Sequence, residues 1–278
     1  MAAPSYPTVD ALAPAQTYAK AVAVGKAKAT MPAYRAFVLA VAAGFYIGLG
    51  GMLMLLVKSD ATLGFAASSL LGGFVFSLGL FAVLVAGAEL FTGNSLMAIG
   101  RFEGAYSLAQ LLRSWAVVYA GNLCGSLLLV ALLRLARFAD LNGGAVGTTI
   151  LSVATAKCAL PWVTAAFRGV MCNVLVCLAV WMGFAGKTVV DKFLAAAMPV
   201  MAFVACGFEH CVANMFFIPM GLVTLGMTGA PAGMDVSALT PGGLLSNLSA
   251  ATLGNVLGGV CFLAALYIFA FGTNVEKK

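Results

Sequence analysis

Long apolar runs alternate with short polar stretches along the whole chain, at a spacing typical of helices that cross a lipid bilayer. A spanning helix needs about 20 predominantly apolar residues, because the hydrocarbon core is about 30 Å thick. Six runs reach or approach this length, at residues 36–57, 66–86, 108–135, 163–184, 193–207 and 248–271. The pattern predicts an all-α polytopic membrane protein with six transmembrane helices.

The second and fifth runs each end in a stretch that breaks the apolar pattern and carries a carboxylate. Residues 87–94 read Gly-Ala-Glu-Leu-Phe-Thr-Gly-Asn, and residues 207–214 read Gly-Phe-Glu-His-Cys-Val-Ala-Asn. Glycine, glutamate and asparagine recur at the same internal positions, and the Gly-Asn pair at 121–122 recurs at 254–255. Halves with three spans each must be inverted relative to one another. We therefore expect two inverted three-helix repeats with helices 2 and 5 interrupted.

The interrupted stretches contain the polar groups best suited to handle an ion inside the membrane. Irregular backbone at that depth is tolerated only where it is buried in protein or lines a cavity, so the two breaks should face one pathway. Half-helix N-termini attract anions, and Thr92 adds a hydroxyl there. His210, the only histidine of the chain, either donates a hydrogen bond or a proton to an anion, or is a buried side chain satisfied by a neighbour.

The carboxylates and amides of the breaks are expected to support the structure. Glu89 and Glu209 would cap freed backbone N–H groups or pair with a basic residue at a helix end. Asn94 and Asn214 would bind freed backbone groups. Contact with a permeating ion is the alternative for each of these four side chains.

Bulky apolar side chains lie near the breaks, and lysines lie near both ends of the expected pathway. The apolar set suits either hydrophobic gates or ordinary helix packing, and comprises Phe76, Leu80, Leu90, Phe91 and Phe203. Lys28 and Lys157 either attract anions into the two vestibules or are ordinary solvated charges.

Composition agrees with a membrane location. The chain is 63% hydrophobic and 9% charged, with a mean hydropathy of +1.05, whereas a soluble domain carries about 25% charged residues. The net charge of +6 reflects lysines and arginines that flank the spans, and calls for no nucleic-acid partner. The seven cysteines form no CxxC pair, so no metal, disulfide or cofactor is expected. No aspartate lies in a predicted span, which argues against an intramembrane hydrolase or other enzyme.

The charges between the spans predict the orientation. Placing both termini in the cytoplasm puts ten lysines and arginines inside, Lys277 and Lys278 among them, and five outside, as the positive-inside rule prefers. We expect a cytoplasmic amphipathic segment over residues 1–35, helical from 8 to 30 and lying on the membrane surface. The six-helix channel domain follows over 36–272, and a short tail over 273–278. Residues 138–160 and 226–246 are predicted to be polar or Gly- and Pro-rich connections.

Residues 88–94 and 207–215 resemble the two signature segments of the formate/nitrite transporter family, and residues 176–182 are similar to the family as well. The resemblance covers about residues 15–272. It implies an aquaporin-like six-helix protomer in a homopentamer, with one pore per protomer and a central Thr92–His210 pair. It further implies that the five bulky apolar residues form hydrophobic constrictions. Lys157 then matches the extracytoplasmic lysine of the family, and Lys28 the cytoplasmic one.

The resemblance also implies the substrates, which are small monovalent anions of weak acids, in the cytoplasmic (inner) membrane. Residues 207–210 and 216–221 look like formate channels, whereas 89–93 and 46–50 are similar to nitrite and hydrosulfide channels. We expect formate first, nitrite as the alternative and hydrosulfide third. A neutral-solute channel of the aquaporin type is the alternative from a different class, but its Asn-Pro-Ala motifs are missing.

Overall fold

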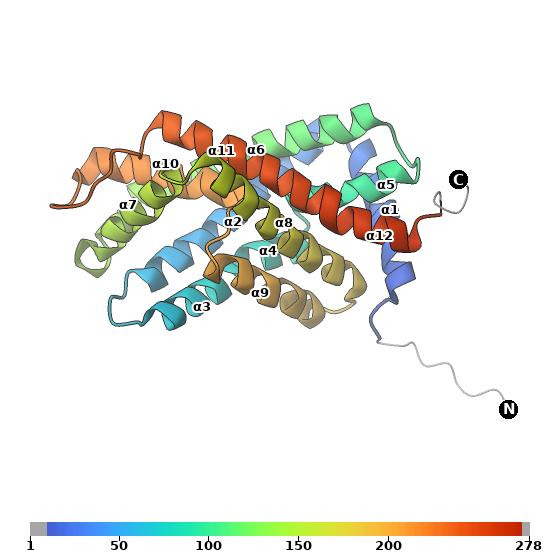
Figure 1. The fold of residues 1–278 in the computed structure, drawn as a ribbon, viewed down its shortest axis with the longest axis horizontal. Coiled ribbons are helices and arrows are strands. Elements are labelled where there is room, and N and C mark those ends of the chain that lie inside the picture. Colours follow the sequence, from blue (N-terminus) through green and yellow to red (C-terminus); the bar gives the residue numbers. More distant parts are fainter. Residues whose placement is uncertain (1–9, 274–278) are drawn as a thin grey trace.

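The computed structural model describes residues 10–273, and these form helices with no β-strand. Six helices are long and apolar enough to cross a membrane: α2 (Ala33–Lys58), α3 with α4 (Phe65–Ala86), α6 (Leu108–Leu135), α8 (Trp162–Ala185), α10 (Cys211–Thr228) and α11 to α12 (Pro241–Phe271). In Figure 1, α3 and α9 run side by side, and α8 lies beside α11. The expected six-span, all-helical architecture is confirmed.

The fifth spanning helix is α10, which follows the break, and not the predicted run at residues 193–207, which precedes it. The run at residues 193–207 forms α9 (Val189–Ala205), which is 17 residues long, and the segment after the break forms the longer α10. In the first half, the longer helical segment comes before the break and the shorter one comes after it. Two consecutive helices, α3 (Phe65–Phe76) and α4 (Leu78–Ala86), precede the break, and only the short α5 (Met97–Phe102) follows it.

The predicted polar connection at residues 138–160 is wrong, because most of it is helical. After two short 3-10 turns, α7 (Ala145–Cys158) packs along α10. Val146, Ile150 and Ala154 are buried on one face, four residues apart. That spacing is helical, but the glycines before the helix and the threonines within it mask the pattern.

The sixth span begins earlier than the predicted start at residue 248. Its first helix starts at Pro241, after Thr240, whose hydroxyl oxygen accepts a hydrogen bond from the backbone N–H of Gly243 at 3.0 Å. A threonine N-cap followed by proline is a helix-start signal. The Gly- and Pro-rich composition of residues 226–246 concealed it. A π-helical segment (Gly258–Ala264) joins α11 to α12.

The N-terminal helix packs against protein. α1 (Pro14–Thr30) contacts α5 and α8, and Tyr18 and Ala21 on one face are buried. One side of the helix expected on the membrane surface is therefore covered by the bundle. The predictions made for residues 1–9 and 274–278, which include Lys277 and Lys278, fall outside the described residues.

Glycines let two helix pairs approach closely. Gly121 of α6 lies against the backbone of α2 at Phe37, and Gly254 of α11 lies against the backbone of α8 at Ala166. A methyl group at either glycine would collide with main-chain atoms. Small residues at such crossings are a common packing device in membranes, because they allow close backbone contact.

Asn122 on α6 ties the first break to α2. Its side-chain amide donates hydrogen bonds to the carbonyl oxygens of Ala40 and Glu89 at 2.8 and 2.9 Å. Its oxygen accepts the N–H of Phe91 at 2.9 Å. One asparagine thereby satisfies two main-chain groups that the interruption leaves without helical partners.

Asn255 on α11 repeats this arrangement in the second half. Its amide donates to the carbonyl oxygens of Gly169 and Glu209, both at 2.8 Å, and its oxygen accepts the N–H of Cys211 at 2.9 Å. The matched Gly-Asn pairs of the sequence therefore occupy matched structural positions, one in each three-span half.

We predict that Asn122→Ala or Asn255→Ala lowers the thermal unfolding midpoint of the purified protein. Each change leaves two buried main-chain groups of a break unpaired, at a cost of about 1–3 kcal/mol for each group that finds no water. Differential scanning fluorimetry in detergent measures the midpoint. Ser246→Ala, at an exposed site on α11, is the control and should melt like the parent. Equal midpoints for all four proteins would contradict the role assigned to the asparagines.

Candidate functional site

Both breaks begin at a glycine in left-handed conformation. α4 ends at Ala86, and Gly87 has φ of 82°. After α9, Gly207 has φ of 68°. A Cβ atom would meet open space at both positions. Glycine is therefore favoured by backbone conformation and not by crowding, because L side chains rarely adopt positive φ.

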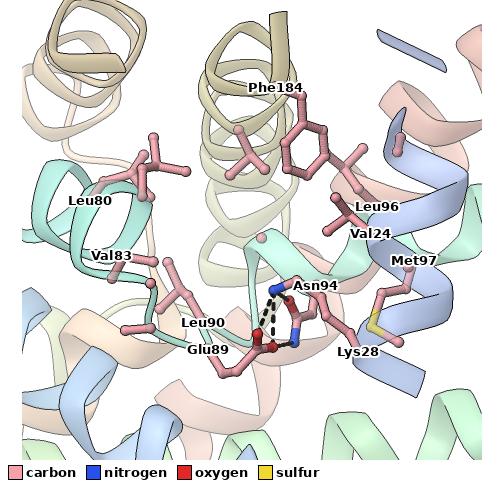
Figure 2. Close-up of a pocket in the computed structure, with 17 residues that line it drawn as sticks. Val24, Lys28, Leu80, Val83, Glu89, Leu90, Asn94, Leu96, Met97 and Phe184 are labelled. Atoms are coloured by element: carbon pink, nitrogen blue, oxygen red, sulfur yellow. Dashed lines mark hydrogen bonds and ion pairs between the residues drawn. The ribbon is translucent and has the colours of Figure 1, made fainter. Parts of the chain in front are cut away.

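The first break is held by a buried ion pair. Lys28 of α1 donates to both carboxylate oxygens of Glu89 at 2.9 Å and to the side-chain oxygen of Asn94 at 2.8 Å. The amide of Asn94 donates to the same carboxylate at 2.9 Å. Figure 2 shows the three side chains closing on one another at the wall of a cavity. The basic partner that was expected for Glu89 is therefore Lys28.

The second break has the matching ion pair. Lys157 of α7 donates to Glu209 at 2.9 Å, and Asn214 donates to the other carboxylate oxygen at 2.6 Å. Asn247 of α11 adds a donor to that oxygen at 3.0 Å. Asn247 was not predicted, because it lies just before the predicted start of the sixth span at residue 248 and the helix that contains it begins at Pro241.

Thr92 and His210 bring the two breaks into contact. The Thr92 Oγ1 atom lies 3.0 Å from His210 Nε2, and both residues are buried. His210 also caps α10, because its Nδ1 accepts the backbone N–H of Ala213 at 3.0 Å. A neutral imidazole has one proton. With Nδ1 accepting, that proton is on Nε2, which then donates to the Thr92 hydroxyl.

Three cavities lie in sequence through the protomer. One of about 210 Å³ is lined by Lys28, Glu89, Leu80, Leu90 and other side chains, and we call it the α1 cavity. Another of about 230 Å³ is lined by Lys157, Glu209, His210, Phe76 and Phe203 among others, and we call it the α7 cavity. A chamber of only about 10 Å³ shares lining residues with both.

The shared residues lie where neighbouring cavities adjoin. Leu80 and Leu90 line both the α1 cavity and the central chamber. Phe76, Phe203 and His210 line both the chamber and the α7 cavity. The Phe203 ring stacks on the imidazole with centroids 5.8 Å apart. Four of the five predicted apolar residues thus lie between cavities.

Phe91 is the fifth, and it is not among the lining residues of these three cavities. Its ring packs edge-on against Tyr119 and Trp115 of α6, with centroids 4.9 and 6.1 Å away. The remaining chamber residues, Ile47, Val176 and Val200, come from α2, α8 and α9. They were not predicted, because they lie within uniformly apolar runs that carry no distinguishing signal.

The site holds no group suited to a metal. Within residues 10–273, no cluster of three or more histidine, cysteine, aspartate or glutamate side chains is arranged to bind an ion. All seven cysteines are free thiols. The polar side chain that lines the chamber is that of His210, in contact with Thr92, and the other lining residues are apolar.

Sequence comparison gives close relatives of known class. A family model described as formate/nitrite transporter matches residues 15–269. The chain is 38% identical over 241 residues to the formate channel FocA of Haemophilus influenzae, covering 84% of this chain and 85% of the relative. It is 36% identical over 267 residues to the formate channel FocA of Escherichia coli K12, covering 93% and 94%.

Solved structures agree with these relatives. A pentameric formate channel with formate bound superposes with a TM-score of 0.78 at 37% identity, covering 86% of this chain and 97% of that one. An ion channel titled as an FNT family member gives a TM-score of 0.80 at 31% identity, covering 92% and 98%. The chain is a multi-pass membrane protein, and it belongs to the formate/nitrite transporter family.

Proposed function

We propose that this chain is a channel for small monovalent anions of weak acids, with formate as its main substrate. The observation that carries the proposal is the row of cavities, in which apolar side chains lie between a small chamber beside His210 and a larger cavity at each end. The names of the relatives and of the formate-bound structure support formate over nitrite. Nitrite and hydrosulfide are the alternative substrates.

The apolar constrictions determine which form of the solute crosses. Leu80 and Leu90 on one side, and Phe76 and Phe203 on the other, supply no hydrogen bonds to replace water around a charge. A bare anion loses hydration free energy there. Passage is easiest for the neutral acid, or for an anion held by a hydrogen bond at the point where its water is lost.

His210 acts in this proposal as a hydrogen-bond donor. Its Nε2–H now points to Thr92, and a small anion entering the chamber would replace the hydroxyl as acceptor. Donating the Nε2 proton outright would leave an imidazolate. Adding a second proton at Nδ1 would break the cap to Ala213. The proton of a neutral acid is therefore supplied from water, with the histidine holding the solute.

Assembly and location follow the relatives in this proposal. A pentameric structural neighbour and large apolar side chains exposed on the outer faces, such as Phe167, Leu135 and Phe269, suit a homopentamer with one pathway in each protomer. We place both termini in the cytoplasm and the protein in the inner membrane, with the α1 cavity opening inward and the α7 cavity outward.

The first prediction concerns the solute. Proteoliposomes containing the protein should take up formate faster than nitrite or hydrosulfide, and chloride should be excluded because it forms no neutral acid near pH 7. Isotope or stopped-flow flux on the same vesicle preparation measures all four, with empty liposomes as the control. Water or glycerol flux without formate flux would overturn the proposal in favour of a neutral-solute channel.

The second prediction concerns His210. Asparagine is a good N-cap residue, so His210→Asn should fold and keep the bond to Ala213. Formate flux should slow because the shorter asparagine amide does not carry a donor as far into the chamber as His210 Nε2 does, yet its dependence on pH should remain. Flux measured between pH 5 and 8 checks this. A flat pH profile in the variant would instead show that the histidine carries the proton.

The third prediction concerns the constriction on the α1 side. Leu90→Val removes one methylene between the α1 cavity and the chamber, so larger acids should pass more easily. We expect the ratio of lactate flux to formate flux to rise several-fold. Leu128→Val, at an exposed apolar site on α6, is the matched control and should leave the ratio unchanged. No change in Leu90→Val would contradict the gating role.

A further inference from the structure

The two cavities that flank the chamber carry different charges. Lys28 and Glu89 are the charged residues lining the α1 cavity, and they neutralise one another. The α7 cavity is lined by Lys58, Lys157 and Arg168 against the single carboxylate of Glu209, three cations less one anion. Since Lys157 is paired with Glu209, the excess positive charge resides on Lys58 and Arg168.

No ion pair within the described residues accounts for the charges of Lys58 and Arg168. Among residues 10–273, neither the Lys58 ammonium nor the Arg168 guanidinium takes part in an ion pair or side-chain hydrogen bond. Asp60, two residues after Lys58, makes no ion pair with it, and its Oδ1 accepts from the N–H and hydroxyl of Thr62 at 2.8 and 2.7 Å. The main chain of Arg168 is fixed, since its carbonyl accepts the N–H of Glu209 at 3.3 Å.

Their positions place both cations at the edge of the cavity. Lys58 is the last residue of α2 and is half-buried, whereas Arg168 on α8 is exposed. The walls between them include the apolar side chains of Leu160, Phe208 and Phe217. Low-dielectric walls around charges of one sign focus the field in a cleft and raise the local concentration of counter-ions.

We propose that Lys58 and Arg168 form an anion-recruiting pair at the mouth of the α7 cavity, and that this pair makes anion conduction asymmetric. The inference rests on the proposed anion channel function. Small carboxylates and oxyanions are the ligand class, because a guanidinium presents two parallel N–H donors to two oxygens. Anions entering from the α7 side start at a higher local concentration than those entering from the neutral α1 side.

Rectification of formate current tests the pair. Single channels in planar bilayers are recorded in equal formate on both sides, and the ratio of currents at opposite voltages is taken. This ratio measures asymmetry whichever way the channel inserts. The parent should rectify at low ionic strength, where the Debye length is about 30 Å at 0.01 M. Adding sodium gluconate to about 1 M, where it is about 3 Å, should abolish the rectification.

The decisive variant is Lys58→Gln with Arg168→Gln. Its larger current should fall by on the order of tenfold at low ionic strength, so that rectification is lost, and salt should have little further effect. Lys58→Arg with Arg168→Lys keeps both charges and should rectify like the parent. Arg134→Gln removes a cation on α6 that lines neither flanking cavity, and it should also behave like the parent.

The outcomes distinguish failure of the proposed cation pair from failure of the proposed channel function. Parental rectification in the double glutamine variant, or an equal loss in Arg134→Gln, would overturn the pair while formate conduction stands. A parent that carries no formate current and also takes up no formate into proteoliposomes would overturn the proposed function, and the pair with it. Formate uptake without current would show that only the neutral acid crosses, and would overturn the asymmetric conduction assigned to the pair while the function stands.

Discussion

Every structural feature of the site follows from one constraint, which is that main-chain polar groups at membrane depth must find partners inside the protein. Two interrupted helices expose such groups near the centre of the bundle. Asn122 and Asn255 satisfy the main-chain carbonyl groups of the two glutamates and the N–H groups two residues after them. The glutamates are in turn neutralised by lysines from α1 and α7. Losing one member of a buried ion pair typically costs about 3–5 kcal/mol, because the other charge is left unpaired.

The same constraint determines the chemistry of the chamber. The first N–H groups of α10 need acceptors, and His210 provides one through Nδ1. A side chain used as a helix cap has only its Nε2 side free for a solute. The interaction with Thr92, which belongs to the other break, keeps that N–H satisfied when the chamber is empty. Capping and burial are thereby combined in one imidazole beside the chamber, which is where the proposed function places the solute.

Much of this was predictable from sequence because breaks at membrane depth need uncommon residues. Glycine, glutamate and asparagine at matched positions located both interruptions, and the lone histidine marked the centre. The partners of the glutamates were not predictable, since Lys28 and Lys157 are separated from them by 61 and 52 residues and sequence alone does not dock α1 or α7. The chamber walls were missed for another reason: Ile47 and Val200 look like any other apolar residue of a span. Phe91 was predicted as a constriction residue by its motif position, whereas its packing against two aromatic rings of α6 was not predictable from the sequence.

The central claim is that His210 is a neutral helix cap whose Nε2–H faces the chamber. The chain contains one histidine, so solid-state ¹⁵N NMR of protein labelled only in histidine gives imidazole signals from this site alone. In lipid bilayers near pH 7 the account predicts one protonated nitrogen, Nε2, and one bare acceptor nitrogen, Nδ1. Two protonated nitrogens, or a proton on Nδ1 instead of Nε2, would contradict it.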